Sequence, residues 1–179
     1  MTVTTPRLVI CFLLAALALG GCSNVTFTEP MPLNRRDLPK FPPKWRGVWT
    51  DSDDMVITIG DTYFEGNDLD KMMLSENVLL RRFHGHLVLN QPEENGEWSI
   101  LLGRRWKDEL KLWTFDGSED SKVAVWAAVL NDSSITEFVS DEQLEVKSYV
   151  LAPENNAAFR KLITEGGLTE SYTLQRVNP

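Results

Sequence analysis

Short stretches in which apolar and polar residues alternate run through most of the chain beyond residue 41, and they constrain the fold more than any other feature. Residues two apart point to the same face of a β-strand, so such a stretch can bury one face and leave the other in water. Clusters that contain glycine or proline separate the stretches at the short spacing typical of hairpins. The clearest expected strands are Met55–Ile59, Thr62–Phe64, His86–Asn90, Glu97–Leu102 and Glu109–Phe115. We therefore expect a mainly β fold of the α+β class, an antiparallel meander or a small barrel-like sheet.

The last third of the chain combines strand and helix patterns. Val146–Leu151 is expected to be a strand, and Glu154–Glu165 a helix, because its apolar residues share one face and two glycines follow it. Leu168–Val177 then returns as the closing strand. The apolar segment Val123–Leu130 fits a strand or a helix, because periodicity alone does not separate the two for so short a run.

The N-terminal region begins with a different signal, an apolar run over Leu8–Leu19 that no polar residue interrupts. A helix that spans a membrane needs about 20 apolar residues, and this run of 12 is shorter. Arg7 precedes it and two glycines follow it, which is the pattern of a secretory signal peptide. We expect residues 1–21 to be this signal and to be removed on export.

The end of this run carries a more specific motif. Leu19-Gly20-Gly21-Cys22 resembles the lipobox of bacterial lipoproteins, an aliphatic residue and two small residues before a cysteine. The resemblance implies cleavage between Gly21 and Cys22, an S-diacylglycerol group on the Cys22 sulfur and an N-palmitoyl group on the freed amine, and hence a membrane anchor. Ser23 is similar to the residue that follows in lipoproteins forwarded to the outer membrane, where the protein would face the periplasm. The alternative is a soluble secreted protein with an unmodified thiol at Cys22.

Composition divides the mature chain into two parts. Residues 22–40 contain three prolines and few large apolar residues, so we expect a lipidated N-terminus followed by an extended tether. Residues 41–179 hold all six tryptophans and are long enough for a single β-rich globular domain. The net charge of −8 argues against a nucleic-acid partner, which would require clustered lysine and arginine side chains.

A second resemblance concerns the start and the end of this domain. Gly47-Val48-Trp49 is similar to the Gly-x-Trp motif that opens the first strand of lipocalins, and Arg176 lies where that family has an arginine near the end of its last strand. The resemblance implies that Trp49 plugs one end of an antiparallel barrel, that Arg176 packs across it, and that the interior holds a ligand. The chain departs from the family pattern, since it has no Thr-Asp-Tyr motif and places a strand after its C-terminal helix. A packed β domain without a cavity is therefore the alternative.

His84 and His86 are the only histidines in the sequence, and Gly85 lies between them. On a continuous strand both imidazoles would face one side, as in a metal-chelating pair, whereas a turn at Gly85 would part them. A catalytic zinc needs a third ligand, and no further histidine and no unmodified cysteine remains to supply it. We therefore expect no metal and no other cofactor, with His84 and His86 as the only candidate ligands.

The sequence contains no Gly-x-Ser-x-Gly elbow, no glycine-rich phosphate loop and no His-Glu-x-x-His. The leading expectation is a lipid-anchored cell-envelope protein, not an enzyme, that acts by binding or assembly with a protein partner. One alternative is a lipocalin-like carrier of small apolar ligands. Another is an envelope hydrolase that uses His84 or His86.

Overall fold

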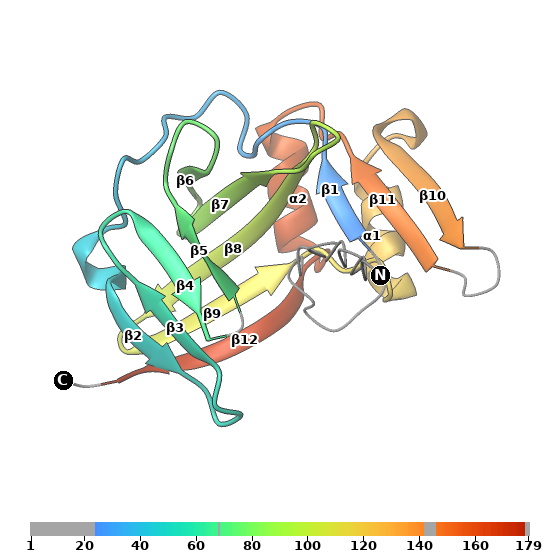
Figure 1. Ribbon diagram of the computed structural model, residues 1–179. Coiled ribbons are helices and arrows are strands. Elements are labelled where there is room, and N and C mark those ends of the chain that lie inside the picture. Colours follow the sequence, from blue (N-terminus) through green and yellow to red (C-terminus); the bar gives the residue numbers. More distant parts are fainter. Residues whose placement is uncertain (1–23, 68, 142–145, 178–179) are drawn as a thin grey trace, which may run out of the picture.

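The computed structural model describes residues 24–67, 69–141 and 146–177 (Figure 1). In this part of the chain 12 strands form one mixed sheet that does not close, and two α-helices accompany it. The predicted mainly β fold is confirmed, as is a C-terminal helix followed by a closing strand. The strands are β1 (Asn24–Phe27), β2 (Gly47–Thr50), β3 (Val56–Ile59), β4 (Tyr63–Gly66), β5 (Leu69–Met73), β6 (Leu79–Phe83), β7 (His86–Pro92), β8 (Trp98–Trp106), β9 (Glu109–Thr114), β10 (Ile135–Asp141), β11 (Val146–Leu151) and β12 (Thr169–Arg176). The helices are α1 (Asp120–Val129) and α2 (Asn156–Thr164), with short 3-10 turns η1 (Pro43–Trp45) and η2 (Asp132–Ser134).

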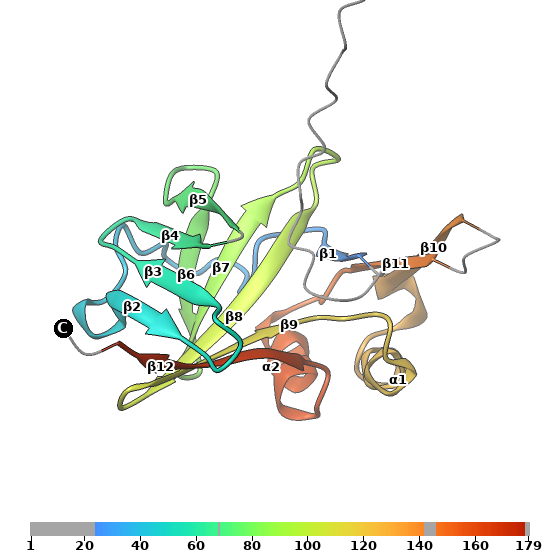
Figure 2. The same ribbon diagram turned by 60° about the horizontal axis from the view of Figure 1, so that its bottom comes forward.

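Strands β2 to β9 together with β12 form a curved antiparallel sheet, which we call the barrel half (Figures 1 and 2). Its strand order is β6-β7-β8-β9-β12-β2-β3-β4-β5, so consecutive strands are neighbours except where β12 enters between β9 and β2. Gln175 of β12 lies opposite both Glu109 of β9 and Thr50 of β2. Within the described residues β5 and β6 do not pair, and the curved sheet is open between them.

The N-terminal segment crosses this opening. The backbone N–H of Leu38 donates to the carbonyl of Leu80 in β6 at 2.7 Å, and that of Phe41 donates to the carbonyl of Asp61, between β3 and β4, at 2.8 Å. The Phe41 side chain is buried in the core of the barrel half. A strap of irregular chain therefore covers the side of the sheet that strand pairing leaves open.

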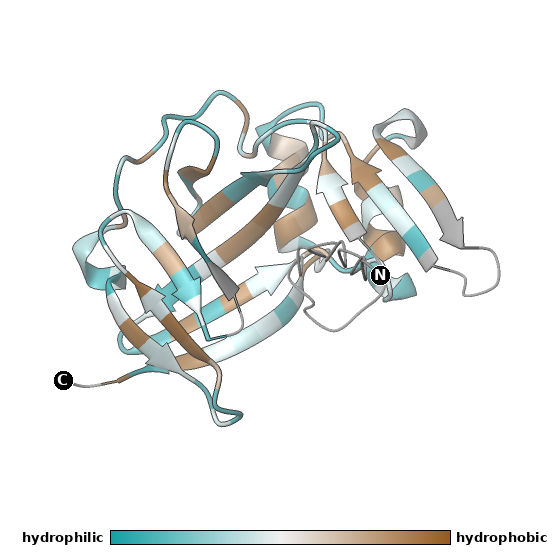
Figure 3. Cartoon of the chain, viewed as in Figure 1, coloured by the Kyte–Doolittle hydropathy of each residue, from teal (hydrophilic) through white to brown (hydrophobic). Residues whose placement is uncertain are grey.

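The core of the barrel half is built from alternate residues of its strands. Trp49, Ile57, Leu110 and Leu174 are fully buried and come from β2, β3, β9 and β12. In Figure 3 the apolar residues of these strands appear as brown bands between paler ones. The period-two pattern predicted β3 and β9 because one face of each packs inward and the other meets water.

Strands β1, β10 and β11 with helices α1 and α2 form the second part of the molecule, which we call the α/β half. β1 pairs with β11 in parallel, from Asn24 opposite Ser148 to Phe27 opposite Leu151, and β11 pairs with β10 in the antiparallel sense. Both helices pack against one face of this three-stranded segment (Figure 2). β8 connects the two halves, because it pairs with β7 and β9 in the barrel half and with β1 at Trp98.

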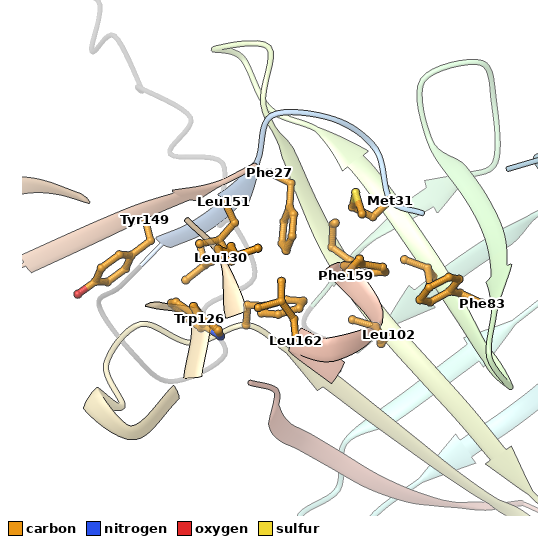
Figure 4. Packing of buried hydrophobic residues seen from close by; sticks show 14 residues of the cluster. Phe27, Met31, Phe83, Leu102, Trp126, Leu130, Tyr149, Leu151, Phe159 and Leu162 are labelled. Atoms are coloured by element: carbon orange, nitrogen blue, oxygen red, sulfur yellow. The ribbon is translucent and has the colours of Figure 1, made fainter. Parts of the chain in front are cut away.

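Aromatic rings dominate the core of the α/β half (Figure 4). The ring of Phe27 meets that of Phe115 edge-on at 4.9 Å between centroids and that of Phe159 at 6.0 Å. Trp126 meets Tyr149 of β11 edge-on at 5.6 Å, and its indole N–H donates to the carbonyl of Gly167 at 2.8 Å. Edge-to-face pairs of this kind add about 0.5–1.5 kcal/mol each beyond the area they bury.

The sequence left strand and helix open for the segment Val123–Leu130. Residues 123–129 belong to helix α1 and Leu130 is its C-cap, and the burial of Trp126 in the aromatic core accounts for that choice. Helix α2 starts after Asn155, whose side-chain oxygen accepts the backbone N–H groups of Ala157 at 2.9 Å and Ala158 at 3.0 Å. Neither helix of the described residues is long and apolar enough to span a membrane.

The residues expected to form a tether are packed into the domain from Asn24 onward. Asn24–Phe27 is a strand inside the sheet, and Met31 is buried. Asn90 clamps Met31 with two hydrogen bonds, its side-chain oxygen accepting the Met31 N–H at 2.7 Å and its amide group donating to the Met31 carbonyl at 2.8 Å. Asn156 holds Leu33 by the same two-bond arrangement at 2.7 and 2.9 Å.

A buried cation completes this attachment. Arg81 of β6 donates to the Asp37 carboxylate at 2.7 Å and to the carbonyl of Pro32 at 3.0 Å. Residues 24–40, which the sequence analysis placed in an extended tether before a domain that begins at Phe41, are thus held against the rest of the fold. Proline keeps the backbone extended, but an extended segment serves as a strand or a packed strap wherever partners exist for its hydrogen bonds.

Candidate functional site at one end of the barrel half

Trp49 and Arg176 lie side by side at one end of the barrel half. Their residues are paired between β2 and β12, and the guanidinium carbon of Arg176 lies 4.4 Å from the centre of the Trp49 ring. The Trp49 indole N–H donates to the carbonyl of Trp45 at 2.9 Å. Arg176 donates to the carbonyls of Arg46 at 2.8 Å and Lys44 at 2.5 Å. The structure thus brings together the two residues that the sequence singled out, and they tie η1 to the last strand.

The space inside the barrel half is almost filled. A cavity of about 20 Å³ remains, with an apolar lining that includes Phe41, Leu89 and Leu112. The Trp45 ring packs so closely on β8 that a Cβ atom on Gly103 would come within 2.9 Å of it. Pockets that hold small ligands typically measure about 300–1,000 Å³, whereas this space takes about one water molecule. Among the described residues, the interior of the barrel half therefore offers little room for a ligand.

An open groove of about 590 Å³ lies outside the core, between η1 and the hairpin that joins β6 to β7. Residues 42–45 form one wall and residues 82–87 form the other. Its apolar surface comes from two adjacent prolines, from Trp45 and Phe83, and from Leu87. Both histidines also line it, so this groove holds the sequence-predicted candidates His84 and His86.

A tight turn between them keeps the two histidines from lying on one face of a single strand. His84 and Gly85 have positive φ values of 45° and 86°, and Phe83 pairs with His86 across the hairpin. Two successive positive φ values are the mark of a type I′ hairpin turn, for which glycine is favoured at the second position. His84 therefore sits at the tip and His86 begins β7, so the two are not alternate residues of one strand. The described residues include no group of three histidine, cysteine, aspartate or glutamate side chains that could hold a metal ion.

His86 is the more enclosed of the two imidazoles. Its ring meets that of Trp113 edge-on at 5.7 Å, and its Nδ1 atom is buried without a hydrogen-bond partner in the described structure. Burial, followed by the positive charge of nearby Arg104, lowers the pKa of His86 below 6.5. The neutral form of His86 therefore prevails at neutral pH.

The charged residues of the groove lining are all basic. Lys44 and Arg82 line it, Arg104 lies near His86, and no carboxylate belongs to the lining. None of these three cations forms an ion pair with a residue that the structure describes, whereas Lys40 and Arg46 share Asp61, and Arg105 and Arg176 share Asp108. A positive groove in a chain of net charge −8 suits a ligand that presents an acidic group beside an apolar one.

Sequence reasoning found the histidines of this groove and the neighbouring Trp49–Arg176 pair, but it missed the wall at residues 42–45. The adjacent prolines Pro42 and Pro43 were not singled out, although Trp45 directly after them was a signal for packing. Gly21 and Cys22, the residues of the predicted cleavage and lipidation site, lie outside the described residues. No family model, no curated protein and no solved structure matches this chain.

Proposed function

We propose that this protein is a lipid-anchored component of the bacterial cell envelope that binds an acidic, partly apolar segment of a protein partner in the groove at the end of the barrel half. The observation that carries the binding proposal is the groove itself, with aromatic walls, unpaired cations and no carboxylate in its lining. The anchoring proposal is supported by the sequence Leu19–Cys22 and by the signal that precedes it.

The lipid anchor follows from the chemistry of Cys22. A diacylglycerol group on its sulfur and a palmitoyl group on its amine would supply three acyl chains, and each buried methylene contributes about 0.8 kcal/mol. One chain holds a protein reversibly, while two or more hold it durably. With Ser23 in the next position, we propose that the protein resides in the outer membrane and faces the periplasm.

A protein partner fits the groove because of the side chains that line it. Aromatic and arginine side chains are enriched where proteins bind one another, and Trp45, Phe83 and Arg82 supply both kinds here. The prolines at 42 and 43 have restricted backbones, so that wall loses little freedom on binding. Unpaired Lys44 and Arg82 would attract an acidic segment from a distance and align it with the aromatic walls.

The other two candidate functions receive less support. A carrier of small apolar molecules needs interior space, and the described interior leaves about 20 Å³. A hydrolase that used the histidines would need a partner to orient an imidazole, and the groove lining brings no carboxylate to His84 or His86.

Anchoring is tested by Cys22→Ala. We expect this variant to take up no labelled palmitate and to remain as the uncleaved precursor, whereas Ser23→Ala should still be labelled and processed. Labelling of Cys22→Ala would contradict the anchor. Density-gradient fractionation of cell membranes tests the location separately, and recovery of the protein with the inner membrane would contradict the proposal for Ser23.

Binding is tested by selecting from a displayed library of random peptides with the mature chain carrying Cys22→Ser. We expect enrichment of peptides that combine Asp or Glu with Phe, Trp or Leu, and weaker binding at higher salt. Arg82→Glu should weaken the selected peptides by about tenfold, which corresponds to about 1.4 kcal/mol. Lys122→Glu reverses a half-buried cation on α1, outside the groove, and is the matched control. Equal binding by the Arg82 and Lys122 variants, or enrichment without acidic residues, would contradict the groove proposal.

A further inference from the structure

The start of β1 lies close to the lipidation site along the chain. Only Ser23 separates Cys22 from Asn24, and two residues span at most about 7 Å. β1 is held in the sheet on both sides, by β11 and by β8. A lipid on Cys22 would therefore hold the beginning of this strand against the membrane surface, with no spacer between them.

An exposed apolar side chain, that of Phe138, lies two strands away from the start of β1. Asn24 is opposite Ser148 in β11, and Ser148 is opposite Phe138 in β10. Neighbouring strands are about 4.8 Å apart, so the backbone of Phe138 lies about 10 Å from that of Asn24. The Phe138 side chain is 52% exposed.

This side chain is on the face of the sheet that the helices leave uncovered. Tyr149 and Leu151 are buried toward the helices, and Tyr149 meets Trp126 of α1. Ser148 alternates with them and so points the other way, and Phe138 shares its face because paired residues of antiparallel strands project on the same side. The other described side chains of β10 and β11 on that face are Thr136 and Val150, which carry no charge. The charged pair of Glu137 and Lys147 lies on the opposite face.

We propose that the uncovered face of β10 and β11 rests on the lipid bilayer and that Phe138 enters the interface between headgroups and acyl chains. This inference rests on the proposed lipid anchor. The short chain between Cys22 and Asn24 selects the bilayer as the occupant of this face, because it leaves no room for the domain to move away. Where β10 and β11 are described, this face carries one aromatic side chain and no charge, so it loses little hydration there and gains the burial of a ring. The carboxylate of Glu97, which accepts the hydroxyl of Thr26 of β1, marks the edge of this uncharged area.

The same orientation gives the groove free access to a partner. β1, β10 and β11 occupy one end of the molecule, while η1 and the C-terminal end of β12 occupy the other in both views (Figures 1 and 2). With the uncovered face of β10 and β11 on the bilayer, the groove beside η1 would lie at the far end of the molecule from that contact.

Fluorescent labelling of the lipidated protein tests this orientation. The mature protein carries no free thiol once Cys22 is acylated, so single cysteines can be introduced and labelled with an environment-sensitive fluorophore such as NBD. The protein is placed in vesicles of phosphatidylethanolamine and phosphatidylglycerol. We expect labels at Phe138→Cys and Thr136→Cys to emit at shorter wavelength and to be quenched by nitroxide groups on the lipid chains. A label at Trp106→Cys, at the exposed tip between β8 and β9, should behave as in water.

The outcomes separate the two proposals. Failure of the protein to float with the vesicles in a density gradient would show that the lipid anchor itself is wrong. Flotation with unshifted, unquenched labels at 136 and 138 would overturn the membrane-facing surface and leave the anchor intact. A shift that disappears when the protein is diluted with more lipid would assign this face to a second copy of the chain, and it would also overturn the proposal. The Thr136→Cys variant retains Phe138, whereas Phe138→Cys removes its ring. If only the label at 138 failed to reach the membrane, the loss of the ring itself would be the cause.

Discussion

The barrel half and the α/β half bury their apolar residues in different ways. In the barrel half nearly every strand pairs with the next one along the chain, and the core consists of alternate residues from those strands. In the α/β half β1 pairs with β11, more than a hundred residues away, and the core is a set of aromatic rings between the sheet and two helices. The barrel half thus depends on local pairing, whereas the α/β half depends on contacts between the two ends of the chain.

This difference also separates the two proposed roles. The groove is formed where a strap of the N-terminal segment meets the β6–β7 hairpin of the barrel half. The proposed membrane-facing surface is formed where β1 joins β10 and β11. The N-terminal segment contributes to the groove and to the proposed membrane-facing surface. Both therefore depend on its attachment to the rest of the fold.

The largest effect is expected when residues 24–40 are removed from the mature chain. The deletion takes β1 from beside β11, takes Phe27 from the centre of the aromatic core, and leaves Asn90 and Arg81 buried without their partners. We expect a loss of cooperative unfolding in urea, followed by circular dichroism.

A single substitution in the same segment should lower the stability without abolishing the fold. Phe27→Ala should lower the free energy of unfolding by about 3–5 kcal/mol, because the ring is completely buried. The exposed neighbour Glu29, changed to alanine, should stay within about 0.5 kcal/mol of the native chain. A chain that starts at Phe41 and unfolds at the native midpoint would show that residues 24–40 are dispensable for stability.

A smaller effect on stability is expected at the end of the barrel half where Arg176 lies against Trp49. Arg176→Ala removes the cation above Trp49 and two hydrogen bonds to the chain around η1, so we expect a loss of about 1–3 kcal/mol in urea unfolding. Arg176→Lys keeps the charge but cannot make both hydrogen bonds from one planar group, and it should recover only part of the loss. Full recovery by lysine would show that charge alone matters there.

The smallest effect concerns the pH dependence contributed by His86. Because burial lowers its pKa in the folded protein below 6.5, the unfolded chain binds this proton at a higher pH than the folded chain does. The contribution of His86 to the free energy of unfolding is therefore complete above pH 6.5 and decreases as the pH falls through 6.5 toward the lower folded value.

Urea unfolding at pH values on both sides of 6.5 measures this effect. His86→Gln should flatten the pH profile in that range relative to the native chain. An unchanged slope in the His86 variant would mean that its imidazole is as accessible to water in the folded protein as in the unfolded one.

The sequence by itself determined strands β3, β4, β7, β8, β9 and β12 of the barrel half, and helix α2. Their alternation, their turn residues and the two glycines after the helix act over a few neighbouring residues, and those local patterns remain readable in the chain. The sequence also singled out Trp49 and Arg176, which the structure places in contact. Its predictions for Cys22 await the labelling experiment.

The tertiary structure alone decided the features that depend on distant partners. Val123–Leu130 is helical because Trp126 reaches a core built from β11 and α2, and residues 24–40 are packed because Asn90, Asn156 and Arg81 provide hydrogen-bond partners for them. Residues 42–45 likewise lie beside His84 and His86 only in the folded chain, because the groove is formed by two segments that are distant in the sequence. An extended backbone has nearly the same local geometry as a tether, a strap or a strand, so only the presence of a partner across the fold distinguishes them.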